Sequence, residues 1–415
     1  MNVKTNDFYI HLHTLIQGSK LNVNTQTQSL FPTIQSGLHL DIVLPNQKHT
    51  VKFSRNSQRA IPTQVWKNIQ EKTVCTLTYI IPESQELIKK RTIAFIIAIQ
   101  EACDNKKIKE INDYVRRCLT WLYIAQKNAR QNKCNSSPLI IYLLFSPLTK
   151  ILPSKNKKTI PVIDWENANT AFTTLCNDNM IETNKSMVRE IVIYRKEEWF
   201  KVFIHETFHN FGFDFSNQSE KYISFGTLFI LKEMCPVNSD VNLYEAYTEC
   251  WARIISIAFA CANNAINADA RYIQCVENKL TQEISWAFFQ LSKVLEYMGI
   301  SYTQLISGKA KEAYQERTSI LAYYMLSLVL FSNYNAFIDW SCPTKTSEST
   351  FKLSDYIVFC CTKSNLESFC MFLQNNFKNP EFVKKIKRNI LDIKSASSKQ
   401  RNTDLYKTMR MTFNL

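Results

Sequence analysis

Residues 190–215, with the sequence EIVIYRKEEWFKVFIHETFHNFGFDF, constrain this chain more than any other stretch. The stretch contains His205 and His209, and Glu206 directly follows the first histidine. Residues four apart lie on one face of a helix, so both imidazoles can reach a single point. An Ile-Val-Ile run before them predicts a short strand, and Gly212 predicts the end of the helix. We therefore expect a strand followed by an aromatic-rich helix, and this helix carries both imidazoles on one face.

Two neutral imidazoles are two of the three protein ligands that a catalytic zinc site requires. Glu206 is placed to hold a water on the metal and to accept its proton. Histidine is otherwise scarce, because the chain has 6 and only His205 and His209 follow position 49. The simpler alternative is an ordinary helix that happens to contain two histidines. The motif predicts that this helix binds Zn²⁺.

Acidic side chains downstream supply candidates for a third metal ligand. A helix predicted over residues 243–262 carries Glu245 and Glu249, which are four apart and share a face. A competing ligand is Asp214, which follows the two histidines closely. The alternative interpretation of the glutamate pair is a solvated helix face, with Glu249 and Arg253 forming an ion pair.

With this pattern, the chain resembles the gluzincin metallopeptidases, in which H-E-x-x-H precedes a helix bearing E-x-x-x-D or E-x-x-x-E. The resemblance covers roughly residues 135–262 and, with Arg253 nearby, looks most like the bacterial toxin branch. It implies that Glu245 is the third zinc ligand and that Glu249 supports a motif histidine from behind. The motif region is also similar to uncharacterised zincin-like proteins of large DNA viruses.

The resemblance implies a zinc metalloendopeptidase in which Glu206 is the general base. An oxyanion is often stabilised by a Tyr or His, and no histidine remains downstream, so Tyr222, Tyr244 and Tyr247 are candidates. The strand before the motif is expected to pair with substrate backbone. An alternative from another class is a structural or interaction protein with the same fold, such as a viral assembly or virion component with little or no peptidase activity.

The predicted fold is α+β, with a zincin-like catalytic domain of a small mixed sheet plus an active-site helix, and a mostly helical C-terminal part. Three regions are expected: a β-leaning N-terminal region at 1–83, the metallopeptidase domain at 84–266, and a helical region at 267–415. Hydrophobic periodicity predicts helices over several stretches, at 87–103, 108–131, 269–299, 309–331, 365–377 and 381–394. Strands are predicted at 38–53, as a hairpin, and at 73–81 and 138–145.

The formal net charge of +14 is concentrated towards the C-terminus. Residues 381–415 carry nine Lys and Arg against three acids, a balance of +6. This basic tail predicts an anionic partner, either nucleic acid or an acidic surface. Solubility alone is the alternative, and nucleic-acid binding as the main function would rest on charge without any recognisable motif.

The 13 cysteines have irregular spacings and form no C-x-x-C pair. In a chain of this size the pattern favours reduced thiols and a cytoplasmic, reducing setting, which for a viral protein means the host cytoplasm or the virion. The most apolar stretch, at 320–331, is too short to span a bilayer, so no transmembrane segment is expected. The first residues show no apolar signal-peptide run.

Overall fold

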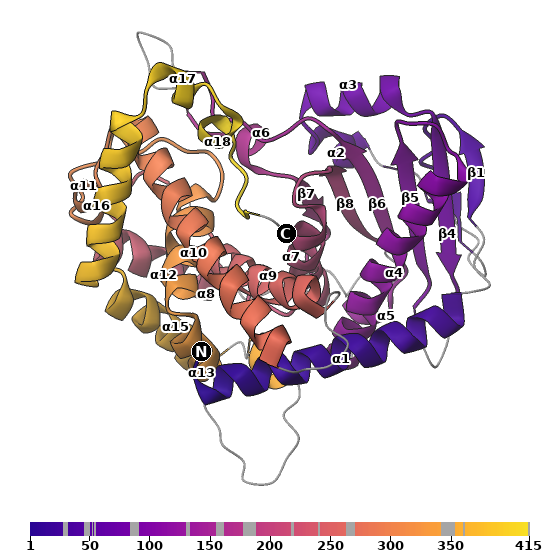
Figure 1. Cartoon of the computed structure of the whole chain (residues 1–415), viewed down its shortest axis with the longest axis horizontal. Helices are drawn as coiled ribbons and strands as arrows, with labels where there is room; N and C mark the ends of the chain where they lie inside the picture. The colour runs from indigo at the N-terminus through magenta and orange to yellow at the C-terminus, as the bar shows by residue number, and fades with distance from the viewer. Residues whose placement is uncertain are drawn as a thin grey trace.

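A six-stranded mixed sheet organises the part of the molecule that holds the motif helix (Figure 1). In the computed structural model its strand order is β1-β4-β5-β6-β8-β7. The strands are β1 (Thr33–Ser36), β4 (Cys75–Ile81), β5 (Ile93–Ile99), β6 (Leu139–Ser146), β7 (Ala171–Thr173) and β8 (Arg189–Arg195). β5, β6 and β8 run parallel, whereas β1, β4 and β7 are antiparallel to their neighbours. The fold is therefore mixed α+β, as the sequence predicted.

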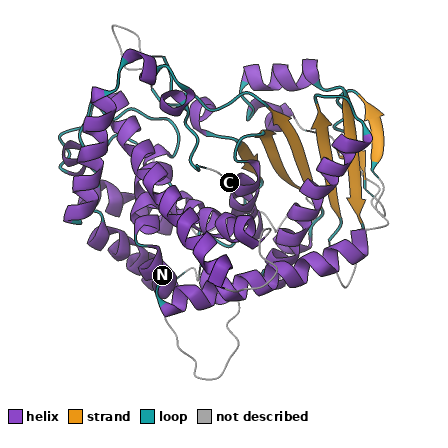
Figure 2. Ribbon diagram, viewed as in Figure 1, coloured by secondary structure: helices purple, strands orange, loops and turns teal. Residues whose placement is uncertain are grey.

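Helices make up most of the remaining structure, and Figure 2 shows the strands gathered at one end of the molecule. The structure describes residues 1–27, 32–44, 50–51, 53, 55–83, 91–129, 133–154, 162–176, 188–216, 220–239, 241–262, 270–341, 353–359 and 362–413. Predicted features that lie outside these residues are the hairpin turn at 45–49 and most of the polar break at 341–349.

The sheet is buried on both faces. Alternate side chains of β5 point in opposite directions, so that Phe95 and Ile97 join one hydrophobic cluster while Ala94 and Ile96 join another. The second cluster is covered by α3 (Thr63–Lys72) and by the short antiparallel pair β2 (Ile42–Val43) and β3 (Thr50–Val51). The first cluster faces α4 (Asn105–Asn128) and the motif helix. Burial on both faces explains why these strands are continuous apolar runs.

The N-terminal region is not mainly β structure, which corrects the prediction for residues 1–83. It begins with a long helix, α1 (Val3–Thr27), and also contains α2 (Arg55–Arg59) and α3. In α1, Phe8, Leu12 and Ile16 are four residues apart and fully buried, which is the spacing of one helix face. The predicted hairpin and the strand at 73–81 are both present, as β2–β3 and β4.

Two helix predictions were wrong. The stretch predicted as a helix at 87–103 contains the strand β5. The prediction failed because a run of consecutive apolar residues shows no helical period that would tell a helix from a buried strand. The stretch at 309–331 becomes regular helix only from Leu321, as η3 (Leu321–Leu326) followed by α12 (Ser327–Ser332). The first of these is a π-helix, in which i→i+5 hydrogen bonds widen the backbone.

The other long helices follow the predicted order. They include α9 (Leu243–Ala262), α10 (Ala270–Met298), α15 (Lys363–Asn376) and α16 (Pro380–Ser395). The shorter helix α13 (Tyr334–Ser341) was not predicted. Shorter elements connect them: α5 (Lys133–Ser136), α6 (Trp165–Ala168), α8 (Glu220–Phe229), η2 (Ile230–Met234), α11 (Tyr302–Ile306), α14 (Ser354–Ile357), α17 (Ser398–Arg401) and α18 (Asp404–Lys407). α9 packs against both α7 (Trp199–Phe211) and α10, which joins the sheet region to the helical region.

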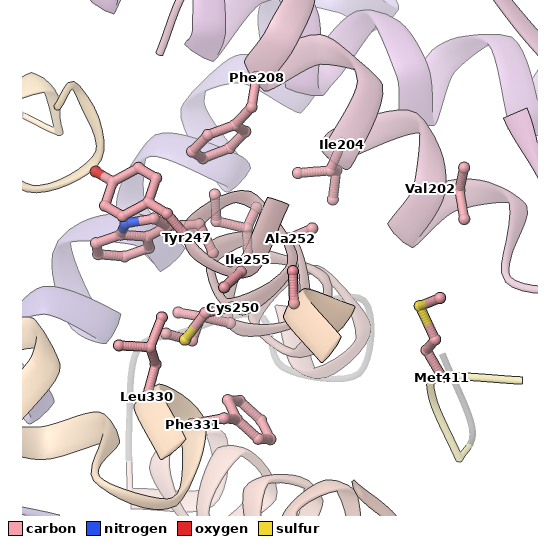
Figure 3. Packing of buried hydrophobic residues seen from close by; sticks show 14 of the residues in the cluster. Val202, Ile204, Phe208, Tyr247, Cys250, Ala252, Ile255, Leu330, Phe331 and Met411 are labelled. Atoms are coloured by element: carbon pink, nitrogen blue, oxygen red, sulfur yellow. The ribbon is translucent and has the colours of Figure 1, made fainter. Parts of the chain in front are cut away.

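One hydrophobic cluster crosses all three predicted regions. It extends from Phe8 in α1 to Met411 near the C-terminus, and Figure 3 shows the part of it between α7 and α9. α1 packs against α4, α9 and α13. The predicted boundary at 83/84 falls inside the main sheet, between the paired strands β4 and β5.

Two cysteine pairs differ from the prediction of reduced thiols. Cys134 is bonded to Cys176, and Cys261 is bonded to Cys275. Within the described residues, no single helix is long and apolar enough to cross a bilayer, although a sharply bent pair, 321–332 with 334–341, meets the length and composition requirement.

Candidate metal centre

The motif helix α7 lies between two backbone turns of left-handed conformation. β8 ends at Arg195, and Glu198 then adopts a φ of 56° at the N-terminal end of α7. Gly212 ends the helix with a φ of 69°, a conformation that glycine adopts without steric cost. The predicted order of strand, helix and glycine cap is confirmed. Every residue of α7 after Trp199 is buried, so the motif side chains project from a helix held on all sides.

Three ligand atoms from two helices converge on one point. His205 Nε2 lies 3.1 Å from His209 Nε2 and 3.0 Å from Glu245 Oε2. His209 Nε2 lies 3.4 Å from the same oxygen of Glu245. Because α9 packs against α7, the first turn of α9 carries Glu245 across to the two histidines. Among the described residues, these three side chains form the cluster that could hold a metal ion.

The outward nitrogen of each imidazole contacts a buried carboxylate. His205 Nδ1 lies 3.1 Å from Glu249 Oε2, and His209 Nδ1 contacts Asp214 Oδ2. Both carboxylates remain ionised. Burial raises their pKa, but cationic and polar neighbours lower it by more than burial raises it, so the net pKa is below the ordinary value. An ionised carboxylate only accepts hydrogen bonds, so each Nδ1 carries the proton. When the rings are neutral, each Nε2 presents its lone pair to the common point, although the facing carboxylates outweigh burial and raise the pKa of both imidazoles.

This arrangement fits a divalent metal ion. Two imidazole lone pairs and a carboxylate oxygen repel one another at such distances unless a proton or a cation lies between them. A tetrahedral ion with bonds of about 2.05 Å separates its ligand atoms by about 3.3 Å, which matches the observed spacing. Two nitrogens and one oxygen are also a donor set that zinc accepts, with a fourth position left for water.

The pKa shifts of the converging groups oppose one another. Burial lowers the pKa of His205, but hydrogen bonds that Glu245 and Glu249 accept from its ring outweigh this effect and raise the pKa overall. Burial raises the pKa of Glu245, but His209 and His205 lower it further, and the net pKa is well below the ordinary value. Burial also raises the pKa of Glu206, which is 8% exposed and lines a cavity beside the histidines.

Glu249 belongs to a buried ionic network and not to a solvated helix face. Lys201 Nζ lies 3.0 Å from both of its carboxylate oxygens, and Arg253 Nε lies 2.9 Å from one of them. All three side chains are at most 2% exposed. Two cations thus hold the carboxylate that orients His205. The sequence showed the Glu249–Arg253 spacing, but it contained no signal for Lys201.

Asp214 does not reach the point where the three ligand atoms meet. Besides contacting His209 Nδ1, its carboxylate accepts hydrogen bonds from Ser216 and from the hydroxyl of Thr248. The structure thus places the predicted alternative ligand behind His209, in the same relation that Glu249 has to His205.

The predicted tyrosines occupy three different environments. The ring of Tyr244 lies 5.7 Å from that of His209. Tyr247 is buried and donates its hydroxyl to Ile357 O at 3.0 Å, away from the centre. Tyr222 lies on α8 and is not part of the cavity wall.

A fourth tyrosine, which sequence reasoning missed, lies in the wall of the cavity beside the histidines. Tyr323 lines the same cavity as His205 and Glu206, and its ring lies 6.0 Å from that of His205. Burial, followed by the charge of Glu245, raises its pKa, so the hydroxyl keeps its proton at neutral pH. Tyr323 projects from the π-helix η3, and its distance along the chain from the motif left no local signal.

The motif strand cannot add a substrate strand, which corrects that expectation. β8 pairs with β6 on one side and with β7 on the other, so both of its edges are occupied. β7 is the outer strand of the sheet, and Thr170 and Ala171 at its beginning line the cavity.

No protein-family model, curated protein or solved structure matches this chain.

Proposed function

We propose that this protein is a zinc-dependent metallopeptidase with a zincin-like catalytic domain. The observation that carries the proposal is the convergence of His205 Nε2, His209 Nε2 and Glu245 Oε2 within 3.4 Å, with Glu206 beside them in a cavity. Buried carboxylates orient both imidazoles, which is the support that catalytic zinc ligands require.

Each residue of the site has a distinct task. His205, His209 and Glu245 would hold a zinc ion, which would supply a water of lowered pKa and polarise the scissile carbonyl. Glu206 accepts the proton from that water and returns it to the leaving amine. Tyr323 donates its hydroxyl to the developing oxyanion, a position that its protonated state and its place in the cavity wall support.

The outer edge of the sheet suits a peptide substrate. Among the described strands, β7 has a neighbour on one side only, and its first residue reaches the cavity. An extended peptide that pairs with this edge would place a backbone carbonyl near Glu206. Main-chain pairing of this kind binds many sequences, so side-chain pockets would set any preference.

The decisive experiment compares wild type with Glu206→Gln on a peptide library, with bound zinc measured in both proteins. Glutamine keeps the shape of the side chain but cannot accept a proton at neutral pH, so zinc should stay while hydrolysis falls by ~10²–10⁴-fold. Glu166→Gln, on the half-exposed helix α6, is a matched control that should leave the rate unchanged. Hydrolysis at the wild-type rate in Glu206→Gln would refute the mechanism.

A structural or interaction role with little or no peptidase activity is the second candidate. The C-terminal segment, which contributes Met411 to the wall of the cavity, favours it, because a partly filled site limits access for substrates. Bound zinc in both proteins with no hydrolysis of any peptide by wild type would make this the better account.

A further inference from the structure

The last described residues of the chain, 407–413, lie against the candidate site. Figure 1 shows this segment passing from α18 into the space between the helices and the sheet, towards α7 and β7. Met411 lines the cavity together with His205 and Glu206. In Figure 3, Met411 lies on the same side of the hydrophobic cluster as Val202 of α7, which lines that cavity too. The segment is therefore part of the wall of the site.

The beginning of the segment pairs with the backbone of the sheet region. Leu152 N donates to Lys407 O at 2.9 Å, and Met409 N donates to Lys150 O at 3.0 Å. These two bonds form an antiparallel bridge, as an added strand would. Main-chain groups of both segments make these two bonds, and the ammonium of Lys293 also donates to Thr408 O.

Further along, side chains of the helical region bind the segment's carbonyl oxygens. Arg410 O accepts from Gln290 Nε2 at 2.6 Å and from Trp286 Nε1 at 3.1 Å. The hydroxyl of Tyr324 donates to Met409 O. Gln290 and Trp286 belong to α10 and Tyr324 belongs to η3, and both of these helices pack against α9, which carries Glu245.

Two buried carboxylates bind the amides at the end of the segment. Thr412 N donates to Glu198 Oε1 at 2.5 Å, and Phe413 N donates to Glu283 Oε1 at 2.8 Å. Glu198 is 5% exposed and Glu283 is 2% exposed. The amides of the segment add to the partners that these buried carboxylates already have, which for Glu198 include Lys150.

Many of these contacts go to main-chain groups, but Met409, Met411 and Thr412 are also buried, and the Thr412 hydroxyl donates to Glu198. The groove therefore suits an extended peptide with side chains like those of residues 407–413. We propose that it binds an extended peptide in trans, and that residues 407–413 are its intramolecular occupant, which an incoming peptide must displace. Because Met411 forms part of the cavity wall, displacement also opens the space beside Glu206. The proposal concerns binding, so it stands or falls separately from hydrolysis.

Hydrogen exchange on the full-length wild type tests whether the segment can leave. A displaceable segment opens locally, so the amides of Thr412 and Phe413 should exchange at least ~100-fold faster than those of β6, which open only with larger unfolding. Equal exchange rates in the segment and in β6 would show that the segment leaves its place only when the protein unfolds, and would overturn the proposal.

Peptide binding tests whether the groove accepts a ligand in trans. The probe is a fluorescent synthetic peptide with the sequence of residues 405–413. Thr412→Pro/Phe413→Pro removes both amide donors, whereas the control Thr412→Val/Phe413→Leu retains them. A tethered segment competes at an effective concentration of about 1 mM, so the proline variant should bind the peptide at least ~10-fold more tightly than wild type and control.

Equal peptide affinity in the wild type and a folded proline variant, or no binding to either, would refute the groove as a peptide site. Circular dichroism establishes that the variant is folded. Should the variant fail to fold, the exchange rates of the wild type decide the question alone.

Discussion

The Nε2 atoms of His205 and His209 lie 3.1 Å apart, and the other nitrogen of each ring contacts a carboxylate on the far side. Glu249 and Asp214 thereby hold the proton of each ring on Nδ1, so that the Nε2 lone pairs face each other when the rings are neutral. Such a pair is poorly arranged for an empty core but well arranged for a cation. The site's organisation thus extends beyond the converging atoms to the two residues behind them.

Removing either imidazole should abolish stoichiometric zinc binding. Wild type should contain about one Zn²⁺ per chain, because three converging ligands and a water complete a tetrahedral site. Elemental analysis of His205→Ala and His209→Ala should find the metal lost. His13→Ala, which removes a buried imidazole that packs on Tyr272, is the control and should keep it. Full zinc content in a variant that carries both His205→Ala and His209→Ala would rule out this site.

Glu245→Gln should weaken zinc binding more than Glu249→Gln or Asp214→Asn. Glu245 Oε2 lies among the converging atoms, whereas the other two carboxylates act on the metal only through a histidine. Loss of such an indirect partner costs ~10–100-fold in affinity. Competition with a chelator measures all three. Should Asp214→Asn alone strip the metal, Asp214 would be the ligand and Glu245 would not.

Tyr323→Phe should lower the hydrolytic rate while KM and zinc content stay unchanged. A single oxyanion donor is worth ~10²–10³-fold in rate. Tyr244→Phe is the matched control, because its ring also lies near a motif histidine. A larger loss in Tyr244→Phe than in Tyr323→Phe would transfer the role to Tyr244.

Lys150→Met should destabilise the protein by about 3 kcal/mol, because it leaves the carboxylate of Glu198 buried without its cation. Lys150→Met/Glu198→Gln should recover part of this loss, since it removes the stranded charge. Chemical denaturation measures both. Burial raises the pKa of Glu198, but Lys150 lowers it further, for a net decrease. The pair's contribution is therefore complete above the ordinary carboxyl pKa, and acid removes it as the pH falls through the lowered value.

The exposed face of α16 should bind polyanions in a salt-sensitive way. Lys384, Lys387 and Arg388 are exposed there, while Ile386 and Ile390 are buried on the other face. Replacing the three cations by glutamate should reduce retention on heparin, and the difference should shrink as salt rises. A charge reversal at Lys67, which is exposed on α3, is the control. Identical retention of both variants would show that α16 has no special role.

The sequence alone determined the elements that carry the motif. Three elements were predictable: the strand β8, the helix α7 that ends at Gly212, and the helix α9 with Glu245 four residues before Glu249. Their apolar spacing and the residues that end them are local features of the sequence. β5 was not predictable, since a strand buried on both faces has the same apolar pattern as a buried helix. In α1 the helical spacing of Phe8, Leu12 and Ile16 is hidden by the polar residues that surround them, so this helix was not predicted.

Only the tertiary structure decided which distant groups meet at the site. Asp214 lies close to the motif in sequence, yet packing of α9 places Glu245 among the imidazoles and leaves Asp214 behind His209. Tyr323 and residues 407–413 reach the cavity from more than one hundred residues away along the chain. Local spacing determines which face of a helix a side chain occupies. The burial of that face against another element determines what the side chain touches, and no local pattern records it.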